Sequence, residues 1–163
     1  MTTIAVYCFD TPISAAELLA LVEGLVTEKS IRLKDAAIVL WPEGKEKPNI
    51  EYLDELSNGE GLGTAFWGLL LSRIFIIPSF GVAVGAALGS LSGKFSDYGI
   101  SPGFMNNIAD KVTQGTSALF LMAGEKEIYE VIQTAKQIEM RFEIITTSLS
   151  SEEERLLRHD FKD

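Results

Sequence analysis

The sequence is short of cysteine and histidine, with one of each among its 163 residues, Cys8 and His159. One cysteine excludes a disulfide framework within the chain and any zinc site built on several thiolates. Basic residues are also scarce, since 14 of them against 23 acidic residues give a net charge of -9. Nucleic-acid binding depends on Lys and Arg that neutralise phosphates, so this charge argues against nucleic acid as a partner.

A basic leader is missing as well. Residues 1–10 contain no Lys or Arg, and Asp10 interrupts the first apolar run. A secretory signal needs both a basic start and a longer apolar stretch. We therefore expect a cytoplasmic protein in which Cys8 stays reduced. The hydrophobic share of 47% is enough to bury a core and argues against a disordered chain.

Charge is nearly absent from one stretch of the chain. Between Gly61 and Gly93 the only charged residue is Arg73, whereas half of the 14 glycines fall there. The rest of the chain has the composition of an ordinary acidic α/β domain. We therefore expect one domain over residues 1–163, interrupted by an apolar helical hairpin at 61–95.

Strand and helix signals alternate on both sides of this stretch. Apolar or β-branched runs predict strands, and apolar residues spaced by three or four positions predict helices. The expected strands are Ile4–Phe9, Ala36–Trp41, Ile50–Leu53, Ser117–Met122 and Arg141–Leu149. The expected helices begin at Thr11 or Ser14, at Ser101, at Glu125, and at Ser150 or Ser151. This order predicts an α/β (α+β) fold, a ferredoxin-like sandwich with an inserted glycine-zipper helical hairpin.

Particular residues mark the expected helix starts. Capping-box spacing occurs at Ser14 with Glu17, at Ser150 with Glu153, and at Ser151 with Glu154. Thr11 and Pro12 are the alternative start for the first of these helices. Ser101 precedes Pro102, and proline suits the first helical position because the N–H that it lacks would have no partner there.

Glycines recur every four residues late in the charge-poor stretch, at Gly81, Gly85, Gly89 and Gly93. Pro78 disfavours helix at the residue before it, so two helices of about 16 residues each are expected. The first of them carries its own stripe of small residues, Thr64, Gly68 and Ser72. Facing stripes of small residues let two backbones approach closely. Close packing must offset about 0.8–1 kcal/mol for each glycine inside a helix.

The bulky residues of this hairpin need a cover of their own. One interpretation is that the small-residue stripes only let the hairpin fold on itself. That interpretation leaves a surface built from Phe66, Trp67, Leu69, Leu70, Phe75 and Ile76. Because a soluble monomer rarely exposes a large apolar patch, we expect lipid or other copies of the chain to cover it.

Arg73 favours protein over lipid as this cover. A helix of about 16 residues is roughly 24 Å long, which is short of a hydrocarbon core of about 30 Å. Helical spacing points Arg73 away from the small-residue stripe, and an Arg inside a bilayer costs about 2.5–3.5 kcal/mol. In a homo-oligomer, one carboxylate from a neighbouring copy would satisfy it. Partial membrane insertion and a soluble homo-oligomer both stay open.

No arrangement of residues typical of an enzyme is visible. We expect His159 on the surface and Cys8 in the core, without a catalytic partner for either. Gly59–Gly63 is rich in glycine before a helix, but it lacks the Walker Lys-Ser/Thr, which favours a hinge over an anion site. The acidic run Glu152–Glu154 is typical of a helix start. Asp97 and Tyr98 are the best candidates for a polar contact, because they stand where the hairpin joins the domain.

Five segments carry a resemblance to a known family. They are Ala65–Leu70, Gly81–Gly93, Ser96–Ile100, Gly115–Phe120 and Thr147–Ser150. In that order they resemble a bacterial and archaeal family, domain of unknown function 1269, over nearly the whole chain. The sequence departs from the family at Arg73, where the family is usually apolar. Members are often described as probable membrane proteins because of the hairpin, and the family has no established activity, so the resemblance implies an architecture without a function.

We expect a non-enzymatic protein that self-associates through the hairpin, in solution or at the inner face of the cytoplasmic membrane. The expected self-association residues are Thr64, Gly68, Ser72, Arg73, Gly81, Gly85, Gly89 and Gly93. No catalytic, cofactor-binding or metal-binding residue is expected, and the expected partners are other copies of the chain or membrane lipid. The alternative is a small-molecule-binding or regulatory α/β domain with its ligand on a face of the sheet, by analogy at the level of the fold.

Overall fold

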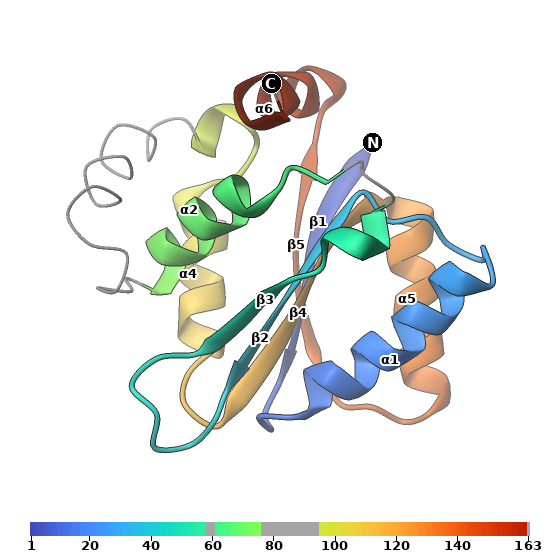
Figure 1. Cartoon of the computed structure of the whole chain (residues 1–163), viewed down its shortest axis with the longest axis vertical. Coiled ribbons are helices and arrows are strands. Elements are labelled where there is room, and N and C mark those ends of the chain that lie inside the picture. The colour runs from blue at the N-terminus through green and yellow to red at the C-terminus, as the bar shows by residue number, and fades with distance from the viewer. Residues whose placement is uncertain (58–60, 76–94, 163) are drawn as a thin grey trace.

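The computed structural model describes residues 1–57, 61–75 and 95–162 (Figure 1). In chain order its elements are β1 (Thr2–Phe9), α1 (Ser14–Thr27), β2 (Asp35–Trp41), β3 (Asn49–Tyr52), the 3-10 helix η1 (Asp54–Ser57), α2 (Thr64–Phe75), α4 (Pro102–Lys111), β4 (Thr116–Gly124), α5 (Glu125–Gln137), β5 (Glu143–Leu149) and α6 (Ser151–Lys162). The predicted zipper glycines Gly81, Gly85, Gly89 and Gly93 lie outside the described residues, as do Gly59, Glu60 and Ile76.

Five strands form one sheet in the order β3-β2-β4-β1-β5, and every neighbouring pair is antiparallel. The N-terminal strand β1 lies between the two last strands of the chain. Its residue Val6 pairs with Phe120 of β4 on one side and with Ile145 of β5 on the other. All eight residues of β1 are buried. The predicted α/β class is confirmed, and the first strand of the chain is an inner strand of the sheet.

Helices cover both faces of this sheet (Figure 1). α1 and α5 lie on one face, and α2 and α4 lie on the other with α6 at one end of their layer. Ala5 and Tyr7 of β1 belong to the core under α1 and α5, whereas Ile4 and Val6 belong to the core under α2 and α4. Successive side chains of a strand point to opposite faces, so a strand buried on both faces must be apolar throughout.

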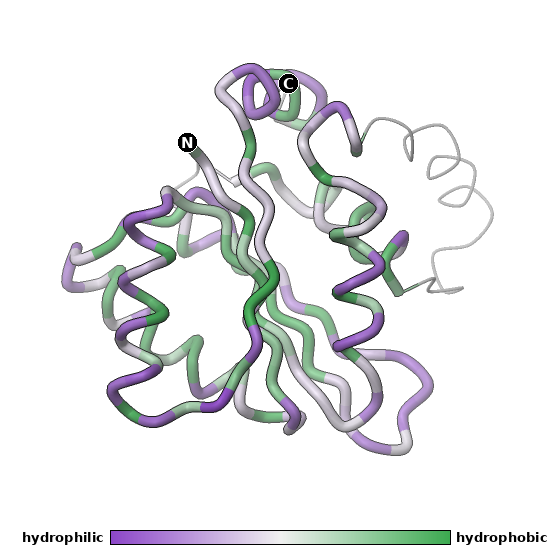
Figure 2. Tube along the Cα trace, turned by 180° about the vertical axis from the view of Figure 1, so that it is seen from behind, coloured by the Kyte–Doolittle hydropathy of each residue, from purple (hydrophilic) through white to green (hydrophobic). Residues whose placement is uncertain are grey.

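Figure 2 shows how hydropathy is distributed along the chain, with hydrophobic residues along the strands and hydrophilic ones on the outer turns of the helices. The predicted strands are confirmed with shifts of a few residues at their ends. The predicted partner strand is also confirmed, because β3 pairs with β2 from Ala37–Tyr52 to Leu40–Asn49. The pattern of apolar runs therefore located the sheet correctly.

Two of the predicted helix starts are confirmed in atomic detail. The hydroxyl of Ser101 accepts the N–H of Phe104 at 3.1 Å, with Pro102 at the first helical position. At α6 the N–H of Ser150 donates to Glu153 Oε1 at 2.8 Å, and the N–H of Glu153 donates to Ser150 Oγ at 3.1 Å. This reciprocal pair is the expected capping box, and it satisfies two backbone donors that α6 itself leaves unpaired.

The capping box expected at Ser14 is wrong. Ser14 is already the first helical residue of α1, and no side chain caps that helix from the position before it. A capping hydroxyl must stand one residue outside the helix to accept its free N–H groups. Instead the N–H of Ser14 donates to the hydroxyl of Thr11 at 3.1 Å, so the alternative start at Thr11 supplies the acceptor.

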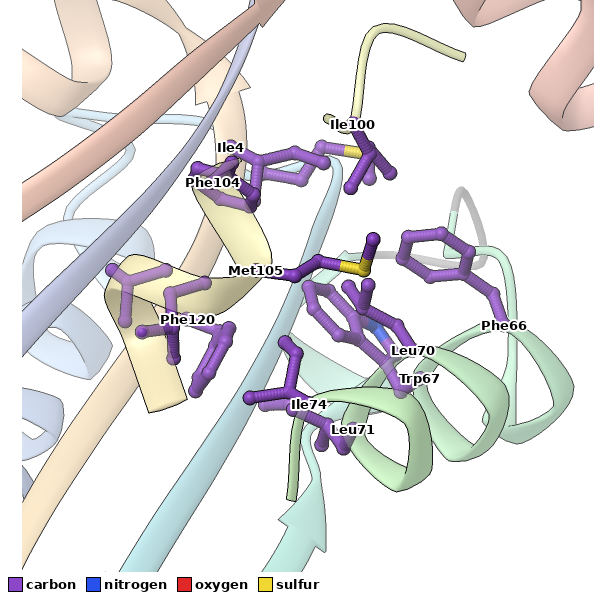
Figure 3. Packing of buried hydrophobic residues seen from close by; sticks show 14 of the residues in the cluster. Ile4, Phe66, Trp67, Leu70, Leu71, Ile74, Ile100, Phe104, Met105 and Phe120 are labelled. Atoms are coloured by element: carbon purple, nitrogen blue, oxygen red, sulfur yellow. The ribbon is translucent and has the colours of Figure 1, made fainter. Parts of the chain in front are cut away.

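The largest departure from expectation is at α2. Phe66, Trp67 and Leu70 are completely buried, and in Figure 3 they point with Ile74 into the space between α2, α4 and β4. Leu69 and Phe75 are half-buried and pack against the same core. For the described part of the predicted hairpin, the expected apolar surface that needs lipid or another copy is therefore wrong.

The second face of the sheet explains this burial. Its side chains are apolar, among them Ile4, Val6 and Phe120, and α2 with α4 is what covers them. Burying a large apolar side chain contributes about 1.5–3 kcal/mol, so α2 gains far more on the sheet than in water. The sequence pattern does not show that this face of the sheet is available to α2, which is why it suggested an apolar surface in need of another cover.

Candidate functional site

A recess of about 270 Å³ opens at one end of the strands, where β1 ends and β4 and β5 begin. Its lining residues are Cys8, Phe9, Asp10, Lys111, Thr116, Arg141, Phe142 and Glu143. Pairing of β1 with β5 stops at Cys8 and Glu143, whereas pairing of β1 with β4 runs one residue further, to Phe9. The chain ahead of β5 leaves the sheet at this point, and the recess lies in the space beside the end of β1.

Aromatic side chains form the apolar wall of this recess. The ring of Phe142 lies 6.0 Å from the ring of Phe9 and 5.8 Å from that of Tyr7, measured between centroids. Phe9 itself is only 3% exposed. The wall is thus continuous with the core beneath α5, which holds its shape.

Four charged residues surround the wall, two of each sign. Lys111 Nζ lies 2.7 Å from Glu143 Oε2, and this hydrogen bond raises the pKa of Lys111 above its ordinary value. Asp10 and Arg141 are exposed, and neither forms an ion pair with any residue that the structure describes. One anion and one cation at the rim are therefore left for solvent or for a ligand.

Cys8 contributes a neutral surface to the recess. The residue is 6% exposed and belongs to the core under α4, so its predicted place in the core is confirmed. Burial and then the charge of Glu143 raise the pKa of its thiol to about 12, against the opposing charge of Lys111. A reactive cysteine needs a lowered pKa, so this thiol is not a nucleophile at neutral pH.

A second polar cluster lies where the predicted hairpin meets the domain. The ring of Phe161 in α6 lies 5.5 Å from that of Phe66 in α2 and 6.0 Å from that of Tyr98. The Tyr98 hydroxyl donates to Asp160 Oδ2 at 2.5 Å. Phe95, the first described residue after the gap, is completely buried 6.3 Å from the Tyr98 ring. Helix α6 therefore contacts the described parts of the chain both before and after residues 76–94.

The two residues expected to make a polar contact here behave differently. Tyr98 is 1% exposed, and burial followed by its bond to Asp160 raises the pKa of its hydroxyl. Asp97 faces solvent. The contact that Tyr98 makes is internal to the chain, and it joins the segment after residue 94 to α6.

Asp35 is a buried residue that the sequence analysis missed. It begins β2 and is completely buried, with Oδ2 accepting the N–H of Leu62 at 2.7 Å and Oδ1 accepting that of Ala36 at 2.9 Å. A Cβ at Gly61 would lie 2.9 Å from Ser57 Oγ and 3.1 Å from Asp35 Oδ1. A side chain at this position would therefore force Ser57 or Asp35 to shift. The only signal of the site in the sequence was an acid at the head of an apolar run.

The environment of Asp35 is poorly suited to charge. Burial raises the pKa of its carboxyl above the ordinary value of 3.8, although the amide of Leu62, the indole of Trp67 and the amide of Ala36 oppose that shift. The nearby charge of Asp54 raises it a little further. Trp67 Nε1 acts at a distance only, because among the described residues this buried donor has no partner in hydrogen-bond geometry.

The described residues of the small-residue stripe are partly enclosed by the chain itself. Ser72 is 1% exposed, and its hydroxyl donates to the carbonyl of Gly68 at 2.5 Å. A Cβ at Gly68 would lie 3.7 Å from the hydroxyl oxygen of Tyr52 in β3. Thr64 is exposed and Arg73 is half-buried. Of the four predicted self-association residues in α2, only Thr64 is fully open to a partner.

The other candidates agree with a structural interpretation. His159 is 75% exposed with Nδ1 3.2 Å from Asp160 Oδ1, which confirms its surface position. In the acidic run, Glu153 caps α6, while Glu154 Oε2 lies 2.9 Å from Lys34 Nζ. Within residues 1–57, 61–75 and 95–162, no three His, Cys, Asp or Glu side chains are placed to hold a metal ion. Gly61 packs against a carboxylate, an environment opposite to that of a phosphate site.

In the described part of the chain, no helix has the length and hydrophobicity required to cross a bilayer. A family model described as "Protein of unknown function (DUF1269)" matches residues 61–162. All five segments noted in the sequence fall in this range, so the resemblance is confirmed over a shorter part of the chain than expected. No curated protein and no solved structure matches the chain.

Proposed function

This chain belongs to the DUF1269 family of proteins of unknown function, and from that premise we propose that it is a non-enzymatic assembly protein that self-associates through residues 61–95. The match begins at Gly61, the residue packed against Asp35, and it includes the whole of the predicted hairpin. The strands β1, β2 and β3 lie before the match. The family match therefore includes the segment for which we propose a role in assembly, together with the elements that follow it.

The observation that carries this proposal is the composition of the segment between two fixed ends. Residues 76–93 carry no charged side chain, and their glycines form three overlapping GxxxG units from Gly81 to Gly93. Phe75 and Phe95, on either side, both pack on the core under α2 and α4. A domain that anchors an uncharged, glycine-spaced segment at both ends is suited to present it to another copy, because glycines allow close approach of backbones.

Two finer features belong to the same proposal. The order β2-β4-β1-β5, with helices α1 and α5 inside two strand–helix–strand units, supports a ferredoxin-like sheet extended at one edge by β3. The glycine-rich segment would act in the cytoplasm, held between copies of the chain or at the inner face of the membrane.

Size-exclusion chromatography with light scattering, on the full chain without detergent, tests the assembly role. We expect the mass of two or more copies of the 17.8 kDa chain. The substitution Gly85→Leu should disperse the oligomer, because a bulky side chain separates backbones that the glycine stripe brings together. Val84→Leu is the matched control, since it lies one position off that stripe and should leave the mass unchanged. A monomer at all concentrations would contradict the proposal.

Membrane association is tested separately by fractionating cells into membrane and soluble pools. The particle mass is then measured in each pool, with detergent for the membrane fraction only. Oligomers in the soluble pool support assembly between copies, whereas recovery only from membranes supports lipid as the partner of residues 76–94.

The recess favours a second candidate function, a small-molecule-binding domain. The sequence suggests a ligand on a face of the sheet, and in the described part of the chain helices cover both faces. The recess at the end of β1 instead combines an apolar wall with charged groups at its rim, as ligand sites do. Native mass spectrometry of the purified chain tests this role. A small molecule that stays bound through purification, and that passes to an excess of ligand-free protein on mixing, would support it.

A further inference from the structure

The recess has features that restrict what it would bind. About 270 Å³ is close to the lower end of the volumes found for ligand pockets, so a metabolite the size of one amino acid suits it better than a nucleotide. Phe9 and Phe142 form its apolar wall. This wall suits a short apolar group rather than a sugar or a phosphate chain.

The charges at the rim restrict the polar part of the ligand. Lys111 and Glu143 neutralise one another at 2.7 Å. Asp10 and Arg141 line the same recess, and no described residue forms an ion pair with either. A guanidinium pairs best with a planar carboxylate, and a carboxylate such as Asp10 pairs with an ammonium group. The rim therefore matches a ligand that carries both charges.

We propose that this recess binds a free α-amino acid with an apolar side chain. Arg141 holds the carboxylate of the ligand, Asp10 holds its ammonium group, and the side chain lies on Phe9 and Phe142. This inference rests on the small-molecule role proposed above and names its ligand class. A simple anion fits less well, because the four charged residues of the recess sum to zero and the whole chain carries a net charge of -9.

Isothermal titration calorimetry on the full chain tests the ligand class with four probes in turn, L-leucine, L-isoleucine, L-methionine and L-phenylalanine. We expect saturable binding of at least one of them at millimolar concentration or below. For leucine, the matched probes are 4-methylpentanoate, which lacks the ammonium group, and 3-methylbutylamine, which lacks the carboxylate. Each should bind about tenfold more weakly, because each loses one charge-assisted contact.

Variants then place the ligand in the recess. Arg141→Gln and Asp10→Asn should each raise the dissociation constant about tenfold. Arg155→Gln in α6 and Asp110→Asn in α4 remove the same charges outside the lining and should leave it unchanged.

Three results would overturn this proposal. They are no binding by any of the four amino acids, equal binding of 4-methylpentanoate and leucine, and unchanged affinity in Arg141→Gln. Native mass spectrometry separates the failure of the ligand class from the failure of the binding role. A retained compound without an amino-acid headgroup would reject the ligand class and keep the role, whereas a ligand-free protein that binds none of the probes would reject both.

Discussion

The carboxylate of Asp35 accepts the N–H of Leu62 across 2.7 Å, and this bond joins the first residue of β2 to the segment that leads into α2. Both residues are buried, at 0% and 3% exposed. The bond therefore ties the segment ahead of α2 to the sheet, and α2 places Phe66 and Trp67 in the core. It also lies at the boundary of the family match, one residue past Gly61.

Asp35→Ala should lower the free energy of unfolding by about 1–3 kcal/mol, because it leaves the amide of Leu62 buried without an acceptor. Urea unfolding followed by tryptophan fluorescence measures this change. Asp110→Ala, an exposed aspartate of α4, is the control and should change the value by less than about 0.5 kcal/mol. A more stable Asp35→Ala variant would show that desolvation of the carboxylate outweighs its bonds.

The effect of Asp35 should also depend on pH. Its pKa is raised in the folded chain, so the folded state binds a proton more tightly than the unfolded state does. The contribution of Asp35 to stability is therefore greatest below the unfolded value of 3.8 and decreases as pH rises through the folded pKa. The stability difference between the wild type and Asp35→Ala should grow when pH is lowered from neutral toward 3.8. A constant difference over that range would contradict the raised pKa.

Glu154 should show the opposite pH dependence. Burial raises the pKa of this carboxyl, but bonds from Thr2, Lys34 and Arg158 and the charge of Lys34 outweigh it, so the pKa lies below 4.5. Its contribution to stability is therefore present above pH 4.5 and is lost as pH falls through the folded pKa. Glu154→Gln should lie furthest below the wild type at neutral pH and approach it in acid. Parallel stability curves for the two proteins would reject this assignment.

The burial of α2 predicts a large effect at Leu70. Leu70→Ala should destabilise the chain by about 2–5 kcal/mol, as loss of a buried leucine leaves a cavity. Leu156 of α6 is 40% exposed, so Leu156→Ala is the matched control and should cost less than about 1 kcal/mol. Thermal unfolding in a detergent-free buffer measures both. If Leu70→Ala changed the particle mass and left stability unaltered, α2 would act at an interface and not in the core.

The bond between Tyr98 and Asp160 predicts a smaller effect that is specific to α6. Tyr98→Phe should cost about 1 kcal/mol, the net contribution of a typical hydrogen bond. Tyr129→Phe removes the same hydroxyl from a side chain that is 60% exposed and should cost nothing measurable. Asp160→Asn combined with Tyr98→Phe forms a double-mutant cycle for the pair. A coupling energy near zero would show that the contact does not hold α6 in place.

The sequence did not predict the recess, because nothing in it shows that the residues of the recess lie close together. They come from three separate parts of the chain, Cys8–Asp10, Lys111–Thr116 and Arg141–Glu143. They meet because β1 pairs with both β4 and β5, and the order of strands in a sheet has no local signature. Asp35 was missed for the same reason, since its partner Leu62 is 27 residues away.

What the amino-acid sequence determined alone is the local structure. Apolar runs located the strands, and Ser101, Ser150 and Glu153 located two helix starts, because hydrogen bonds within a few residues decide both. Only the tertiary structure decided where α2 lies. The hydrophobicity of Phe66, Trp67 and Leu70 is the same whether lipid, another copy or a core covers them. Here they are buried on an apolar face of the sheet, whose strands come from both ends of the chain.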